Sequence, residues 1–139
     1  KKEYPDIKVY AAAEEKEVME SPALNLSSSF GAAFTAQADI YLEDGAEIEV
    51  LGRTCKCLLV PGHTKGGMCY YFPEENVVFT GDTLFCYSVG RTDFPTGDAK
   101  ALEDAIREKL FTLPDETLVL PGHDAQTMIG KEKKGNPYF

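Results

Sequence analysis

Three apolar runs in this chain end in the same way, at a glycine followed directly by a side chain that can bind a metal ion. The segments are "LLVPGH", which ends at His63, "VVFTGD", which ends at Asp82, and "LVLPGH", which ends at His123. Short apolar runs bounded by turn residues are typical of buried strands, and a glycine lets the backbone turn tightly. We therefore expect three buried strands that each present a metal-capable side chain on the loop that follows.

The rest of the chain predicts a mixed α/β domain with helices outside a sheet. Helix formers occupy residues 13–20, and a second helix begins at the N-cap Asp98, with an apolar face made by Leu102, Ala105, Ile106 and Leu110. We expect strands at residues 7–12, 47–52, 53–61, 68–72, 76–81 and 117–122. Residues 82–97 form a long irregular loop, and loops of that length are commonly functional. No internal linker divides residues 1–139, so we predict one domain.

Composition excludes several classes of partner. The net charge is -9, which disfavours nucleic acid and anionic membrane surfaces because both are bound through Lys and Arg. No apolar run approaches the ~20 residues of a membrane span, and we expect no signal peptide because the first residues have no apolar core. The four cysteines form no C-x-x-C pair, and we expect them to be reduced and packed in a cytoplasmic protein.

The chemistry of the three strand ends points to a metal, although a structural interpretation is also open. Two imidazoles and a carboxylate suit zinc or iron, and the two oxygens of Asp82 can bridge two ions. A histidine after Pro-Gly is also common as a surface turn residue, and an aspartate in "GDT" as a turn or cap residue. Both histidines of the chain, His63 and His123, occupy the same context, and this repetition favours a shared metal site.

Four segments together resemble the metallo-β-lactamase superfamily, and within it the glyoxalase II-like (hydroxyacylglutathione hydrolase-like) branch. They are "PGHTKGGMCYYF", "FTGDTLF", "SVGRTDFPTGD" and "PGHDAQTMIGKEKKGNP". The resemblance implies an αββα sandwich with two zinc ions at one edge and a small-molecule substrate. It implies that His63 is the third ligand of the first ion, that Asp82 is the bridging carboxylate, and that His123 is the third ligand of the second ion.

The chain departs from that family in one important respect. The family's His-x-His-x-Asp-His motif is absent, so we expect the sequence to start downstream of it and to form the C-terminal part of the fold. The catalytic, water-activating residues are then unknown, and the chain alone should bind metal weakly and be inactive. The strand at residues 7–12 should become an unpaired edge, which favours a homo-oligomer or strand exchange.

Substrate residues are less defined, and three functions stay open. Asp124 and Ala125 follow His123 at the place where glyoxalase II has an aromatic substrate contact. The segments "GRTDF" and "GHD" are similar to those of persulfide dioxygenases, which have the same fold and use one iron. Arg91 and Asp124 are candidate substrate contacts, but we favour an ion pair between Arg91 and Asp93 that braces the long loop. The three functions are a metal-dependent hydrolase of a thioester or related ester, a mononuclear iron persulfide dioxygenase, and a non-catalytic fragment.

Overall fold

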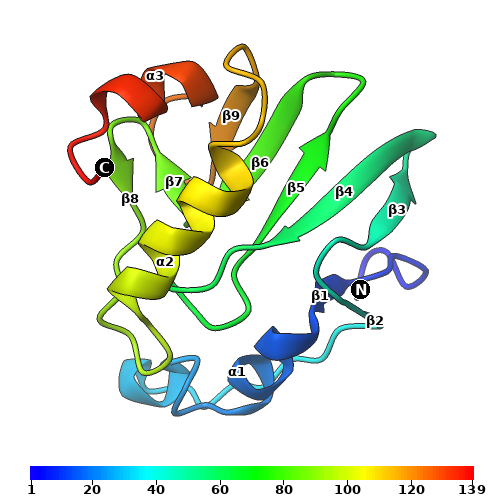
Figure 1. Ribbon diagram of the computed structural model, residues 1–139. Helices are drawn as coiled ribbons and strands as arrows, with labels where there is room; N and C mark the ends of the chain where they lie inside the picture. Colours follow the sequence, from blue (N-terminus) through cyan, green and yellow to red (C-terminus); the bar gives the residue numbers. More distant parts are fainter.

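The computed structural model describes residues 1–139, and a six-stranded sheet forms its centre (Figure 1). The strand order is β10-β9-β6-β5-β4-β3, and every neighbouring pair is antiparallel except β6 and β9, which are parallel. The strands are β3 (Glu47–Val50), β4 (Arg53–Leu59), β5 (Met68–Phe72), β6 (Val77–Gly81), β9 (Leu118–Pro121) and β10 (Thr127–Met128).

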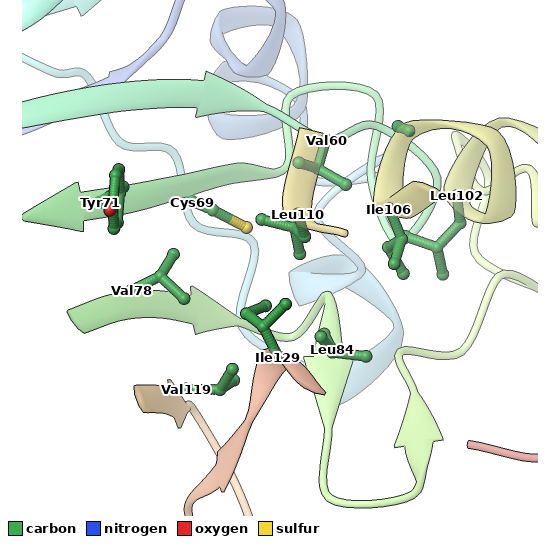
Figure 2. Close-up of a cluster of buried hydrophobic side chains, with 11 residues drawn as sticks. Val60, Cys69, Tyr71, Val78, Leu84, Leu102, Ile106, Leu110, Val119 and Ile129 are labelled. Carbon is green, nitrogen blue, oxygen red and sulfur yellow. The ribbon is translucent and has the colours of Figure 1, made fainter. Parts of the chain in front are cut away.

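Helices cover one face of this sheet, as expected from the sequence. Helix α2 (Ala99–Ala105) begins at Asp98, whose Oδ1 accepts a 2.9 Å hydrogen bond from the Ala101 N–H, and it continues as a π-helical segment, Ile106–Leu110. Helix α3 (Ile129–Gly135) packs on the same core. Figure 2 shows the buried side chains between the layers, which include Val60, Cys69, Val78, Leu84, Leu102, Ile106, Leu110, Val119 and Ile129. Each large apolar side chain buried here contributes about 1.5–3 kcal/mol.

Five of the six expected strands are confirmed as β3, β4, β5, β6 and β9, with ends displaced by at most two residues. The expectation of a buried strand over residues 7–12 is wrong in extent. Strand β1 covers only Tyr10–Ala12, Ile7 is 53% exposed, and Ala12 alone in the strand is buried. The reason is that β1 pairs only with β2 (Ile40–Leu42), in a separate two-stranded parallel sheet.

The helix expected at residues 13–20 is confirmed, although its first turn, Ala13–Glu15, is 3-10 and α1 covers Lys16–Glu20. The loop expected at residues 82–97 contains a small hairpin, β7 (Leu84–Phe85) and β8 (Ser88–Val89). The sequence also did not predict four further elements: a 3-10 turn at Ser27–Phe30, strands β2 and β10, and helix α3. Most of these elements are short, so they carry too few residues for a periodic pattern.

None of the helices has the length and apolar character that a membrane-spanning helix needs.

The opposite face of the sheet is largely uncovered. A hollow of about 790 Å³ lies over β3 to β6 and is lined mainly by apolar side chains. Successive strand residues point to opposite faces, so Phe72 and Phe79 face this hollow while Tyr71 and Val78 face the helices. Strand β1 covers the hollow only in part, through Tyr10. The exposed apolar surface is therefore the face of the six-stranded sheet that the helices do not cover. The sequence predicted an unpaired edge at residues 7–12 instead, and this is wrong for β1, because it pairs with β2.

The hairpin that joins β3 to β4 adds to this apolar face. Its turn is Leu51-Gly52, with φ of 52° and 75°, and Leu51 is 98% exposed. A left-handed backbone suits glycine far better than leucine, and a leucine gains nothing from full contact with water. At the rim, Arg53 and Glu75 form an ion pair, while the second oxygen of Glu75 is buried without a hydrogen-bond partner.

The expectation that the cysteines are packed is confirmed for three of the four. Cys55, Cys57 and Cys69 are buried, Cys86 is half-buried, and none forms a disulfide. Burial raises the pKa of the Cys69 thiol to about 12 and that of Cys55 to about 11, because desolvation disfavours the thiolate. The thiolate is the reactive form, so these two thiols should be inert in the folded chain.

The open face predicts that the 139-residue chain self-associates when it is studied alone. Sedimentation velocity over a concentration series should show dimers or larger species, and Phe79→Lys should shift the chain toward monomer because it places a charge on the apolar face. Phe30→Lys is the matched control, since Phe30 is 85% exposed and lies outside the hollow. A concentration-independent monomer for the unsubstituted chain would contradict this prediction.

The cysteines give a second prediction about the fold. Native chain treated with iodoacetamide at pH 8 should gain one label rapidly, at Cys86, and the other three only after unfolding, because desolvation suppresses their thiolates. Mass spectrometry of peptides locates the labels. Rapid labelling of Cys69 in the folded chain would show that this part of the core is not packed as described.

Candidate metal centre

The three strand ends meet because their strands run in one direction. Strand β4 is antiparallel to β5, β5 is antiparallel to β6, and β6 is parallel to β9. The carboxyl ends of β4, β6 and β9 therefore lie at one edge of the sheet, which is where ligands commonly bind in α/β proteins. The predicted convergence of His63, Asp82 and His123 at one edge is confirmed.

Asp82 lies between the two imidazoles and presents a different oxygen to each. The Nε2 atom of His63 is 3.7 Å from Oδ2 of Asp82, and the Nε2 atom of His123 is 3.4 Å from Oδ1. No group of three or more His, Cys, Asp or Glu side chains surrounds a single point as a cage for one ion. The arrangement is two half-sites that share a carboxylate.

His63 is held with its Nε2 atom facing Asp82. Its Nδ1 atom lies 2.8 Å from the carbonyl oxygen of Arg91, and a carbonyl only accepts, so Nδ1 carries the hydrogen and donates it. Nε2 then bears the free lone pair, which is the arrangement that a metal-binding imidazole needs. The ring also packs edge-on against Phe94, with centroids 5.1 Å apart, and the side chain is only 19% exposed.

The loop that carries His63 is fixed by contacts to α2 and to the first helical turn. Gly62 has φ of +135°, and a Cβ there would lie 2.4 Å from Cβ of Leu102, so only glycine fits. The Gly62 carbonyl accepts a hydrogen bond of 2.9 Å from the Asp98 N–H. On the other side, Oε2 of Glu15 accepts from the Thr64 hydroxyl and the Gly66 N–H, at 2.8 and 2.9 Å.

His123 is held more loosely. Its side chain is 73% exposed, and its ring lies 6.2 Å from that of Phe85 on β7. The backbone before it is fixed, because the Gly122 N–H donates a 2.8 Å hydrogen bond to the Gly81 carbonyl at the end of β6. A Cβ at Gly122 would lie 2.9 Å from Oδ1 of Asp82. Glycine thus lets the His123 loop come close to the shared carboxylate.

The segment after β8 brings the Arg91 carbonyl to His63. A Cβ at Gly90 would lie 1.8 Å from the carbonyl oxygen of Asp82, so no other residue permits this approach. Gly90 also donates its N–H to the Thr83 carbonyl, at 3.0 Å. The sequence predicted neither the role of Gly90 nor that of the Arg91 carbonyl. Any residue type can make a contact through its backbone carbonyl, so the sequence holds no signal for such a contact.

The expected ion pair between Arg91 and Asp93 is present. The guanidinium donates two hydrogen bonds of 2.6 Å to the carboxylate and lies over the Phe94 ring, 4.7 Å from its centroid. The hydrogen bonds from Arg91 lower the pKa of Asp93 to about 2, and the same pair raises the pKa of Arg91. Asp124 is exposed and has a left-handed backbone with φ of 66°. A substrate role for Arg91 or Asp124 stays a prediction.

The chemistry of these donors is one that a metal ion accepts. Two Nε2 atoms and two carboxylate oxygens at one sheet edge are ligands that zinc and iron accept. Each half-site supplies one nitrogen and one oxygen, and structural or catalytic zinc normally takes three or four protein ligands. Each pair of one imidazole and one Asp82 oxygen therefore falls short of a zinc shell, and metal binding by residues 1–139 stays a prediction.

A search of family models matches residues 2–123 to the metallo-beta-lactamase superfamily. Among curated proteins, the chain is 41% identical over 106 residues to the hydroxyacylglutathione hydrolase GloC of Haemophilus influenzae, which covers 76% of this chain and 47% of that protein. It is 38% identical over 136 residues to the probable metallo-hydrolase YqgX of Bacillus subtilis, covering 96% and 64%. It is 42% identical over 106 residues to the human mitochondrial persulfide dioxygenase ETHE1, covering 73% and 42%.

Solved structures agree with this assignment. BLEG-1, a B3 metallo-beta-lactamase, superposes with a TM-score of 0.89 at 38% identity, and TTHA1623 in a di-iron-bound form with 0.83 at 36%. Each match covers 99% of this chain and 67% of the other. The chain spans between about two fifths and two thirds of the length of the three curated relatives named above. With this fold and the shared carboxylate between two histidines, the chain belongs to the metallo-beta-lactamase superfamily.

Proposed function

We propose that this chain is the part of a metal-dependent hydrolase that carries His63, Asp82 and His123 as metal ligands, and that the whole protein cleaves a thioester or related ester. The observation that supports this most is the position of Asp82, with a different oxygen toward each Nε2 atom. A carboxylate so placed can hold two ions together. A structural histidine or a turn-capping aspartate has no need of that arrangement.

The residues of the chain would each supply one property of the site. Zinc, when bound, lowers the pKa of a coordinated water toward neutrality and polarises a substrate carbonyl. The Arg91 carbonyl fixes the tautomer of His63 and keeps its lone pair on Nε2. Asp82 offers one oxygen to each side, and the exposed ring of His123 faces the second oxygen. Phe94 and Phe85 flank the two rings and limit their rotation.

The similarity to GloC supports a thioester substrate, since that relative is named a hydroxyacylglutathione hydrolase. The similarity to ETHE1 supports the alternative, a mononuclear iron dioxygenase that acts on a persulfide. The di-iron form of TTHA1623 supports only that iron can occupy this fold. Metal analysis separates the two proposals: two equivalents of zinc favour the hydrolase, and one of iron with oxygen uptake favours the dioxygenase.

The first test is metal binding by the 139-residue chain. We expect weak zinc binding, because each half-site holds only two donors. Asp82→Asn should weaken binding at both half-sites, and His63→Ala should weaken it by at least about tenfold at one of them. Calorimetry or chelator competition measures this, and Asp104→Asn is the matched control because Asp104 is an exposed carboxylate paired with Lys100. Zinc affinity that is unchanged in Asp82→Asn would refute the proposed ligand role.

The second test is hydrolysis of a glutathione thioester. In a form of the protein that binds zinc tightly, turnover should be removed by a chelator, restored by zinc, and lowered at least about a hundredfold by Asp82→Asn. The 139-residue chain alone should give little turnover, since its half-sites are incomplete. Thioester hydrolysis that resists the chelator would count against a metal mechanism, and turnover of a persulfide with oxygen uptake would favour the dioxygenase.

A further inference from the structure

We infer that Glu132, together with Asn136, is a positioning residue for the metal-ligand edge: from helix α3 it fixes the β7–β8 hairpin, whose two ends carry Asp82 and the Arg91 carbonyl. This inference rests on the proposed function, because it assigns a purpose to the geometry of the proposed ligands. It concerns the segment "GKEKKGN", which the site itself does not use. Figure 1 shows α3 beside β7 and β8 at the C-terminal side of the molecule.

Glu132 is a fully buried carboxylate whose oxygens are satisfied by hydrogen bonds alone. It has 0% exposure. Its Oε1 accepts a 2.6 Å bond from the Thr127 hydroxyl, and its Oε2 accepts bonds of 2.9 Å from the Tyr87 N–H and 2.8 Å from Asn136 Nδ2. No Lys or Arg pairs with it. A buried carboxylate without a cation is costly unless each oxygen has donors, so its position is strictly defined.

The donors come from the tip of the hairpin as well as from α3. Tyr87 lies in the turn between β7 and β8 and has a left-handed backbone, with φ of 55°. That conformation is unfavourable for tyrosine, and the bond from its N–H to Glu132 helps to hold it. Asn136 Nδ2 also donates to the Ser88 carbonyl, at 3.1 Å. A Cβ at Gly135 would lie 3.0 Å from the Tyr87 ring, so glycine makes room for that ring.

The base of the same hairpin lies at the proposed metal edge. Asp82 is two residues before β7, and Arg91 is two residues after β8, where its carbonyl accepts from His63. Phe85, on β7, contacts the His123 ring. A hairpin of two-residue strands has too few ladder bonds to hold its own shape. Fixing its tip from α3 therefore also fixes the groups at its base.

Substitutions at position 132 separate this role from a requirement for charge. In Glu132→Gln, the amide oxygen can accept from Tyr87 and Asn136 while the amide nitrogen donates to Thr127, whose hydroxyl accepts equally well. Glu132→Ala removes all three bonds and leaves the tip tethered only through the Asn136 bond to the Ser88 carbonyl. We expect Gln to preserve the geometry of the edge and Ala to lose it.

The experiment is NMR of the imidazole rings in the metal-free 139-residue chain. The chain has only two histidines, so two ring systems are observed, and the Nδ1–H of His63 reports its bond to Arg91 directly. In Glu132→Ala, we expect exchange of this proton with water to become at least about tenfold faster, and both ring signals to move. Glu132→Gln should restore the original spectrum.

Asp115→Ala is the matched control, because it removes the exposed ion pair between Asp115 and Lys133, which docks the same helix. It should leave the ring signals unchanged even if it lowers the unfolding temperature. A folded Glu132→Ala chain with unchanged ring signals and unchanged exchange would overturn the inference. If Glu132→Ala does not fold, Asn136→Ala takes its place: it removes the bond to the Ser88 carbonyl and one of the three donors to Glu132, so a smaller shift of the same ring signals is expected, and unchanged signals would overturn the inference.

A zinc titration of the unsubstituted chain keeps this inference distinct from the proposed function. If zinc does not shift either histidine but Glu132→Ala does, the proposed ligands are wrong and the positioning by α3 stands. If zinc shifts both histidines but Glu132→Ala leaves them unchanged, the ligands stand and the positioning role fails.

Discussion

The parallel pairing of β6 with β9 is the constraint on which the rest of the structure depends. It brings the carboxyl ends of two strands to one edge, and the antiparallel β5 between β4 and β6 turns the end of β4 to the same edge. A parallel pair needs a long crossover connection. Here that crossover contains the β7–β8 hairpin and α2. Helix α2 packs on the core, and the hairpin lies beside the candidate metal centre.

The centre itself depends on close backbone approaches more than on side-chain number. Gly90 and Gly122 let two loops come within contact of Asp82, and Gly62 lets the His63 loop pack on α2. These glycines have no chemistry of their own. They allow one carboxylate to face two imidazoles, and the Arg91 carbonyl then orients the better-buried ring. Glu15 holds the loop after His63 through Thr64, and Glu132 holds the tip of the β7–β8 hairpin through Tyr87.

The two faces of the sheet differ in how complete they are. Helices α2 and α3 close one face and bury its core, whereas the other face keeps an apolar hollow under β1. At the edge that carries the candidate ligands, likewise, each imidazole has a single partner, one oxygen of Asp82. Both observations agree with a chain that spans only part of the length of its relatives.

The sequence alone determined the local features. Apolar runs that stop at Gly-His or Gly-Asp identified β4, β6 and β9 and the candidate ligands that follow them. Helical spacing identified the buried Leu102, Ile106 and Leu110, because these signals lie within a few residues of each other. Only the tertiary structure decided which contacts join distant segments. His63 meets Arg91 across 28 positions and Glu132 meets Tyr87 across 45, and both contacts use backbone atoms that every residue has. No pattern of residue types records such a pairing, because packing of the whole domain selects it.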